Sequence, residues 1–265
     1  MKLKITVLGC GNAAGVPSIG NHWGQCDPTE PRNRRTRASI AVQSDSSALV
    51  VDTGPDFKFQ INANNIENID AVLYSHAHSD HVNGIDDLRV LRLRHKKVIP
   101  VYGNAETLAD IMRRFDYMFS EIDPEGLYPQ VCAVHELSPA HMGRVMDVEG
   151  IPVIPFVQSH GSAGITLGFR FGNLAYSTDM QTLDQAAIET IRGVDTWIVD
   201  AGAYKMPHNF VHATLRQVFE LNEQVQARQV YLTHMPSFMD YRTLISELPA
   251  GYAPAYDGLV IDAKA

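Results

Sequence analysis

The sequence SHAHSDH at residues 75–81 is the strongest evidence in the chain for its fold and its chemistry. It directly follows the continuous apolar run at residues 71–74, which is typical of a β-strand covered on both faces. His76 and His78 are two positions apart, so their side chains point the same way if the extended backbone continues. The aspartate and histidine that end the stretch would then turn back over the same cavity. Three imidazoles and a carboxylate within residues 76–81 suit zinc or manganese and make little sense as packing groups.

Four further histidine or aspartate residues lie at the ends of other apolar runs. Asp52 ends the run at 48–52, and three more residues follow later β-like runs: His160, Asp179 and His234. A histidine or aspartate at a strand end is common and mostly structural, so each has little weight alone. Their joint order and spacing carry the prediction.

With these residues in view, the chain resembles the metallo-β-lactamase superfamily along nearly its whole length, and SHAHSDH matches its HxHxDH signature. The resemblance implies an α/β fold, the four-layer αββα sandwich, which we expect to form a single hydrolase domain over residues 1–265. It also implies two divalent cations, zinc or manganese. The first would be held by His76, His78 and His160, the second by Asp80, His81 and His234, with Asp179 bridging the two. Asp52 would orient a metal-bound histidine.

Such a site predicts hydrolysis. Two cations about 3.5–4 Å apart can generate a hydroxide near neutral pH and polarise the bond under attack. The redox branch of the superfamily carries a glutamate where this chain has His78, which disfavours iron–oxygen chemistry.

Within the superfamily, the chain is most similar to the phosphoribosyl 1,2-cyclic phosphate phosphodiesterases of phosphonate degradation and their uncharacterised relatives. The residues that carry this likeness are GCG at 9–11, GVP at 15–17, the arginine run at 32–37, LTH at 232–234, LPAGY at 248–252 and YDG at 256–258. The likeness implies a phosphodiesterase acting on a small cyclic or nucleotide-like phosphodiester. Asp80 and His212 are the expected catalytic residues. His212 is expected to open a helix at 212–226, where it would bind a phosphoryl oxygen or protonate the leaving alkoxide.

One departure concerns a structural zinc site that those phosphodiesterases carry after their Gly-Val-Pro. Only Cys26 remains of its cysteine cluster, and Ser237 stands where a histidine is expected. A structural zinc needs about four ligands, so we expect none here. The sequence leaves the roles of His22, Trp23 and Cys26 open.

The charge and composition of the chain limit the classes of substrate and partner that we expect. The chain has 22 Lys and Arg against 30 Asp and Glu, and this net charge of −8 disfavours long nucleic acid as a substrate. A small phosphorylated substrate fits better, with a nucleotide as one candidate, and Arg34, Arg35 and Arg37 are its expected phosphate-binding residues. The apolar runs are shorter than a membrane span, and the first residues lack the apolar core of a signal peptide, so we expect a cytoplasmic protein with no membrane partner. A homodimer is compatible with the sequence.

Three other functions fit parts of the same pattern. A tRNA 3′-processing-type nuclease shares the expected metal site, but the acidic charge opposes it. A thioester hydrolase of this fold would leave His212 without a role. A non-catalytic nucleotide-binding module would not need a complete set of metal ligands.

Periodicity also predicts the individual elements. Strands are expected at 3–8, 38–43, 48–52, 71–75, 98–102, 151–157, 165–171, 173–177, 196–200 and 229–233. Helices are expected at 105–119, 183–192, 212–226 and 238–247.

Overall fold

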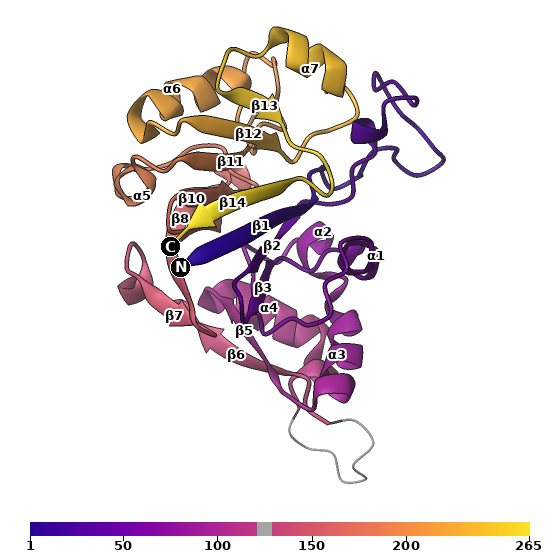
Figure 1. Ribbon diagram of the computed structural model, residues 1–265, viewed down its shortest axis with the longest axis vertical. Helices are drawn as coiled ribbons and strands as arrows, with labels where there is room; N and C mark the ends of the chain where they lie inside the picture. Colours follow the sequence, from indigo (N-terminus) through magenta and orange to yellow (C-terminus); the bar gives the residue numbers. More distant parts are fainter. Residues whose placement is uncertain (121–128) are drawn as a thin grey trace.

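The apolar runs form two seven-stranded sheets in the computed structural model, which describes residues 1–120 and 129–265 (Figure 1). The first sheet has, in spatial order, β14 (Val260–Lys264), β1 (Lys2–Gly9), β2 (Ser39–Gln43), β3 (Ala48–Val51), β4 (Ala71–Leu73), β5 (Ile99–Gly103) and β6 (Cys132–Glu136). The second has β13 (Tyr252–Pro254), β12 (Gln229–Thr233), β11 (Thr196–Asp200), β10 (Leu174–Ser177), β9 (Ile165–Phe171), β8 (Ile151–Ser159) and β7 (Met146–Val148).

The two sheets pack against each other, and helices cover their outer faces (Figure 1). Alternate residues of a strand point to opposite faces, so Leu49 and Val51 lie in the core between the sheets while Val50 faces outward. There Val50 packs with Phe57 and Ile61 of a covering helix. The order helix, sheet, sheet, helix is the expected αββα sandwich, which the structure confirms.

The helices are short and divide between the two outer faces. Those on the first sheet are α1 (Phe57–Ala63), α2 (Ser79–Val82), α3 (Leu88–His95) and α4 (Ala105–Arg114). Those on the second sheet are α5 (Gln185–Ile191), α6 (Leu215–Val225) and α7 (Tyr241–Glu247).

The four predicted helices exist, but each has bounds that differ from those expected. The helices expected at 183–192 and 238–247 run over Gln185–Ile191 and Tyr241–Glu247. The helix expected at 105–119 ends at Arg114 and is followed by a separate 3₁₀ turn at Asp116–Met118. The helix expected at 212–226 begins at Leu215, because Thr214 and Gln217 form a capping box that sets its first turn. His212 therefore lies in the preceding loop, and the expectation that it opens the helix was wrong.

The carboxyl ends of the parallel strands gather the loops that bear the predicted ligands. β3, β4 and β5 are parallel to one another, as are β10, β11 and β12. Asp52 and His234 directly follow β3 and β12, and Asp179 lies two residues after the end of β10. Each has a positive φ, at 66° for Asp52, 48° for Asp179 and 56° for His234. This backbone conformation is costly for residues other than glycine, and such strain is concentrated at functional sites.

No helix within the described part of the chain is long and apolar enough to cross a membrane.

Candidate metal centre and catalytic site

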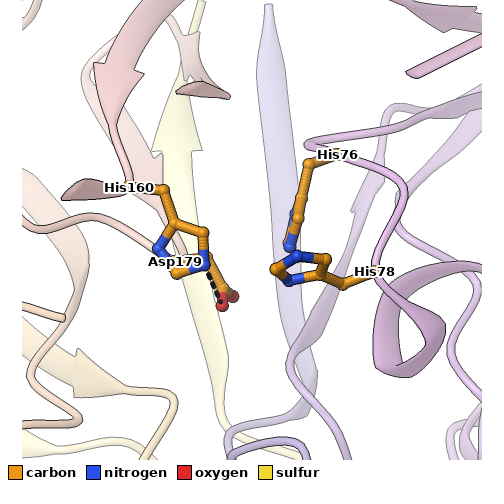
Figure 2. Close-up of side chains that lie close together, drawn as sticks. All are labelled: His76, His78, His160 and Asp179. Atoms are coloured by element: carbon orange, nitrogen blue, oxygen red, sulfur yellow. Dashed lines mark ion pairs between the residues drawn. The ribbon is translucent and has the colours of Figure 1, made fainter. Parts of the chain in front are cut away.

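Side chains from both sheets converge on one point. His76 and His78 follow β4 on one side, and His160 and Asp179 follow β8 and β10 on the other (Figure 2). Asp80 and His81 lie in α2, which immediately continues the same loop, and His234 follows β12. The structure thus brings together all seven residues expected to bind metal.

The seven residues form two groups that could each hold a cation. The first contains His76, His78, His160 and Asp179, and the second contains Asp80, His81 and His234; within each group the ligand atoms lie within 4.8 Å of one another. Asp179 faces both groups. Its Oδ1 is 3.6 Å from Nε2 of His160, while its Oδ2 is 2.9 Å from Nε2 of His81 and 3.4 Å from Nε2 of His234.

Unpartnered nitrogen atoms show that these residues fit a bound cation. The buried Nε2 atoms of His76, His81 and His234 make no well-directed hydrogen bond with the described residues, although those of His81 and His234 lie at ion-pair distance from Asp80 and Asp179. Buried polar atoms almost always have hydrogen-bond partners, so three such atoms in one cluster indicate a ligand. Imidazole nitrogen and carboxylate oxygen together are the donors that zinc and manganese accept.

Hydrogen bonds on the far side of three imidazoles leave Nε2 free in each. The Nδ1–H group of His81 donates to Oδ2 of Asp52 at 2.7 Å, and that of His160 donates to the carbonyl of Val211 at 2.8 Å. Nδ1 of His76 is 2.9 Å from the Ser75 hydroxyl. Such contacts set the tautomer and the ring orientation of a metal-binding histidine.

Asp52 reaches both groups, because Ser75 links it to His76. Its Oδ2 accepts a hydrogen bond from Ser75 Oγ at 2.7 Å, and its Oδ1 accepts one from Ser75 N at 2.8 Å. The Ser75 hydroxyl has one proton, which it gives to Asp52, so it accepts from His76. Sequence reasoning did not identify Ser75, although its position directly before the first histidine was a usable signal.

The electrostatics of the cluster keep its carboxylates ionised. Burial acts to raise the pKa of Asp179, but the imidazoles of His234 and His81 outweigh it and hold the pKa well below the usual range. Burial, together with the neighbouring imidazoles, lowers the pKa of His76 well below its usual range. Burial acts to lower the pKa of His81, but Asp179, Asp52 and Asp80 outweigh it and raise the pKa well above its usual range. Ionised carboxylate and neutral imidazole are the forms that bind metal, so His81 would release a proton when a cation binds.

Arg114 supports the loop between the two first histidines. Its guanidinium donates to the carbonyl of Ala77 and to Oδ1 of Asn83, both at 2.6 Å, and forms an ion pair with Asp110 at 3.2 Å. Sequence reasoning missed this residue, since nothing in its neighbourhood indicates a contact with residues 37 positions earlier.

His212 lies beside the cluster and pairs with Asp200. Its Nδ1 is 2.7 Å from Oδ2 of Asp200, and its ring packs against those of His160 and His234 at 5.2 and 4.7 Å between centroids. Burial acts to lower the pKa of His212, but Asp200 outweighs it and raises the pKa to about 9. The Asp200–His212 pair can therefore hold a proton at Nε2, next to the expected metal ligands.

The loop that carries His212 is anchored around Phe210. Its carbonyl accepts a hydrogen bond from Ser162 N at 2.8 Å, and Oδ1 of Asn209 accepts one from His212 N at 2.9 Å. Gly161 allows this approach, because it has a φ of 61° and a Cβ there would lie 1.8 Å from the Phe210 carbonyl oxygen. The loop and the turn after His160 are thus held in contact.

The three arginines expected to bind phosphate have different environments. Arg35 is buried, and its guanidinium donates to the carbonyl of Met239 at 2.6 Å, so it joins two loops. Arg37 pairs with Asp56 at 3.0 Å. Arg34 is exposed, and its guanidinium lies 5.1 Å from the centre of the Trp23 ring. Of the three, Arg34 alone is open to solvent and pairs with no carboxylate among the described residues.

The segment that departs from the phosphodiesterase pattern is packed onto the loop after His234. Cys26 is buried, with its thiol 3.6 Å from the Met239 carbonyl. Gln25 N donates to the Ser237 carbonyl at 2.8 Å. His22 is exposed, and its backbone pairs with that of Ser18 in a tight hairpin.

Comparison with known proteins agrees with this geometry. The profile described as "Beta-lactamase superfamily domain" matches residues 48–235. This span includes all the residues of the cluster, and the chain belongs to the beta-lactamase superfamily.

Individual relatives cover most of the chain. A crystal structure titled as a new diphosphatase from the PhnP family shares 32% identity with it, with a TM-score of 0.86 over 99% of this chain and 98% of the other. An octanoyltransferase of Porphyromonas gingivalis is 29% identical over 99% of this chain, which spans about half (52%) of that relative's length. A ribonuclease Z of Mycobacterium sp. (strain KMS) is 27% identical, over 77% of this chain and 72% of the relative.

Proposed function

We propose that the protein is a metal-dependent phosphodiesterase with a dinuclear site, acting on a small cyclic or nucleotide-like phosphodiester. The observation that carries this proposal is the position of Asp179, whose two oxygens face two separate histidine groups. A carboxylate so placed suits a bridge between two cations, each completed by the imidazoles of its own group. The likeness to a PhnP-family diphosphatase and to ribonuclease Z supports phosphorus–oxygen bond cleavage.

The bound cations would activate water and neutralise charge on the phosphoryl oxygens. The side chains of the protein would bind the cations and orient the residues around them. Six imidazole and carboxylate groups, together with Asp179, would hold the cations, and the hydrogen bonds of Asp52 would maintain the orientation of His81 and His76. Asp80, a cation ligand in this scheme, also lies within 3.6 Å of His234 and so joins α2 to the loop after β12.

His212 is proposed to act on the leaving group. Asp200 engages Nδ1, so Nε2 carries the proton that can be transferred to a departing oxygen. The packing of His212 against His160 and His234 supports this role, because it would put that proton at the edge of the group of expected metal ligands. General acid help of this kind is typically worth about 10²–10⁴-fold in rate.

The test compares leaving groups. Wild type and His212→Ala are assayed with bis(p-nitrophenyl) phosphate and with a ribosyl cyclic diester, with and without chelator, after metal content is measured. We expect hydrolysis that chelator abolishes, and a loss in the variant that is concentrated on the ribosyl diester, whose alkoxide needs a proton. Equal, large losses on both substrates would indicate phosphoryl binding by His212, and equal, small losses would remove it from the mechanism. Failure of the metal-loaded wild type to hydrolyse any phosphodiester would refute the proposed function.

Ribonuclease Z activity is the second candidate, favoured by the likeness over 77% of the chain. The net charge of −8 opposes it, because gripping a long polyanion requires basic surface. Assay with a tRNA precursor beside the small diesters separates the two activities.

A further inference from the structure

A cavity of about 340 Å³ adjoins the first group of ligands. It borders His76 and the exposed His78, whereas His212 packs against His160 and His234. A substrate whose phosphoryl group sits at the metal centre therefore has room for one substituent in this cavity, away from the proposed proton donor. Cavities that bind small ligands commonly begin at about 300 Å³.

The walls of the cavity differ in chemistry. One wall comes from the start of α4 and presents Asn104, Glu106 and Asp110, and the other comes from the turn before β9 and ends at Ile165, which is half exposed. A ligand with hydroxyl groups on one side and carbon on the other matches these two walls. Its hydroxyl groups would contact the polar wall of α4, and its carbon atoms would contact the apolar wall that ends at Ile165.

The polar wall has unused hydrogen-bonding groups. Oδ1 of Asn104 caps α4 by accepting from Thr107 N at 2.8 Å, while its amide nitrogen has no acceptor among the described residues. Glu106 forms no ion pair with any described residue. Asp110, by contrast, is neutralised by Arg113 and Arg114. The wall therefore offers a free amide donor and a free carboxylate acceptor, which a sugar hydroxyl can satisfy together.

The same wall disfavours a second anion. Among the described residues lining the cavity there is no lysine or arginine, and Glu106 contributes an uncompensated negative charge. A like charge brought beside it in a partly enclosed site is repelled.

From this arrangement, and resting on the proposed function, we infer that the cavity binds an uncharged, hydroxyl-rich substituent of the diester, such as a sugar or polyol without a further phosphate. Asn104 and Glu106 are its specificity-determining residues. Asn104 donates to a hydroxyl oxygen, Glu106 accepts from a hydroxyl proton, and Ile165 covers the carbon face.

The experiment measures binding, so that its result does not depend on turnover. Dissociation constants of the zinc-loaded protein are determined by calorimetry for methyl phosphate, ribose 5-phosphate, ribose 1,5-bisphosphate and ethanolamine phosphate. We expect ribose 5-phosphate to bind about tenfold more tightly than methyl phosphate, the gain that one or two good hydrogen bonds provide. The bisphosphate is expected to bind more weakly than ribose 5-phosphate.

Variants assign the preference to the two residues. Glu106→Ala and Asn104→Ser should each reduce it, and serine keeps the helix cap that Asn104 provides. Glu106→Lys should reverse the order of ribose 5-phosphate and the bisphosphate. Glu189→Lys, which makes the same charge change at an exposed position on α5, is the control and should leave the order unchanged.

Two results would overturn the inference. Equal affinity for methyl phosphate and ribose 5-phosphate would show that the cavity does not bind the sugar. Tightest binding of ethanolamine phosphate, lost in Glu106→Gln, would make the cavity a site for a cationic group. Absence of diesterase activity with the sugar preference intact would refute the proposed reaction and leave this binding site standing.

Discussion

Replacing Asp52 by asparagine tests the hydrogen bonds that orient the expected metal ligands, without changing any of those ligands. Asp52 is fully buried and accepts hydrogen bonds from His81 Nδ1 and from both the hydroxyl and the amide of Ser75. Asparagine preserves the shape but supplies one acceptor oxygen, so its amide group would face the N–H of His81. The variant loses a hydrogen bond to a charged group, worth about 1.5–3 kcal/mol.

This energy corresponds to a loss of about 10–100-fold in metal affinity, since about 1.4 kcal/mol is a factor of ten. The second group should suffer most, because His81 contacts Asp52 directly. The first group should suffer less, because Asp52 reaches His76 only through the hydroxyl of Ser75. We therefore expect one site to weaken before the other.

Competition with a chromophoric chelator measures both affinities. Asp70→Asn is the matched control, because Asp70 lies directly before the start of β4 and accepts from Ala48 N at 2.9 Å, remote from the ligands. Unchanged affinity at both sites in Asp52→Asn would refute the orienting role. An equal loss in the Asp70 variant would show that a general destabilisation is responsible.

Three other predictions use different parts of the molecule. Asp179→Ala should abolish turnover and lower metal content by elemental analysis, and near-normal rates with full metal would remove this residue from the site. Gly161→Ala should displace the Phe210 carbonyl and reduce turnover at least about tenfold with metal retained, as expected when a catalytic group is misplaced by about 1 Å; a wild-type rate would contradict the contact. Burial raises the pKa of Asp257 to about 6, so ionisation of this carboxyl group destabilises the folded state. The free energy of unfolding of wild type, relative to that of Asp257→Asn, should therefore fall by about 3 kcal/mol as the pH rises from about 4 to about 6. Above about pH 6 the difference should stay constant. Urea unfolding of both proteins across this range measures the difference, and a constant difference would show that this carboxyl does not titrate there.

The sequence indicated the strands better than the helices because the strands are buried. The ten expected strands all occur, since continuous apolar runs such as 71–74 have no other stable placement between two layers. The edge strand β14 was missed because its residues alternate with exposed charged groups. The helix α3 was missed because its apolar residues Val90 and Leu93 are exposed to solvent, so the apolar residues of α3 do not fall on one face with helical periodicity.

The residues of the candidate site could be predicted where they lie close together in the sequence or end an apolar run. They could not be predicted where only the folded structure brings distant residues into contact. The expected metal ligands stand out in the sequence because four of them lie within residues 76–81 and the others follow apolar runs. Asp200 was weighed as a partner for His212 but could not be distinguished from a structural carboxylate until the distance of 2.7 Å was seen. The contact between Arg114 and Ala77 depends on how α4 packs beside the loop, and no local pattern encodes that.

The pairing of β1 with β14 has a consequence for synthesis of the protein. β1 and β14 lie side by side (Figure 1), with Lys2 paired with Lys264. Near the start of β14, the carboxylate of Asp257 accepts hydrogen bonds from the backbone N–H groups of Cys10 and Thr36. β1 therefore gains its neighbour β14 only after about 250 further residues have been synthesised, and a nascent chain that already contains every expected metal ligand still has β1 exposed at one edge of its first sheet. Contacts between such distant segments form slowly. Competence to bind metal should consequently arise only after β14 has been synthesised, and ribosome-stalled chains that end near residue 240 should remain sensitive to protease.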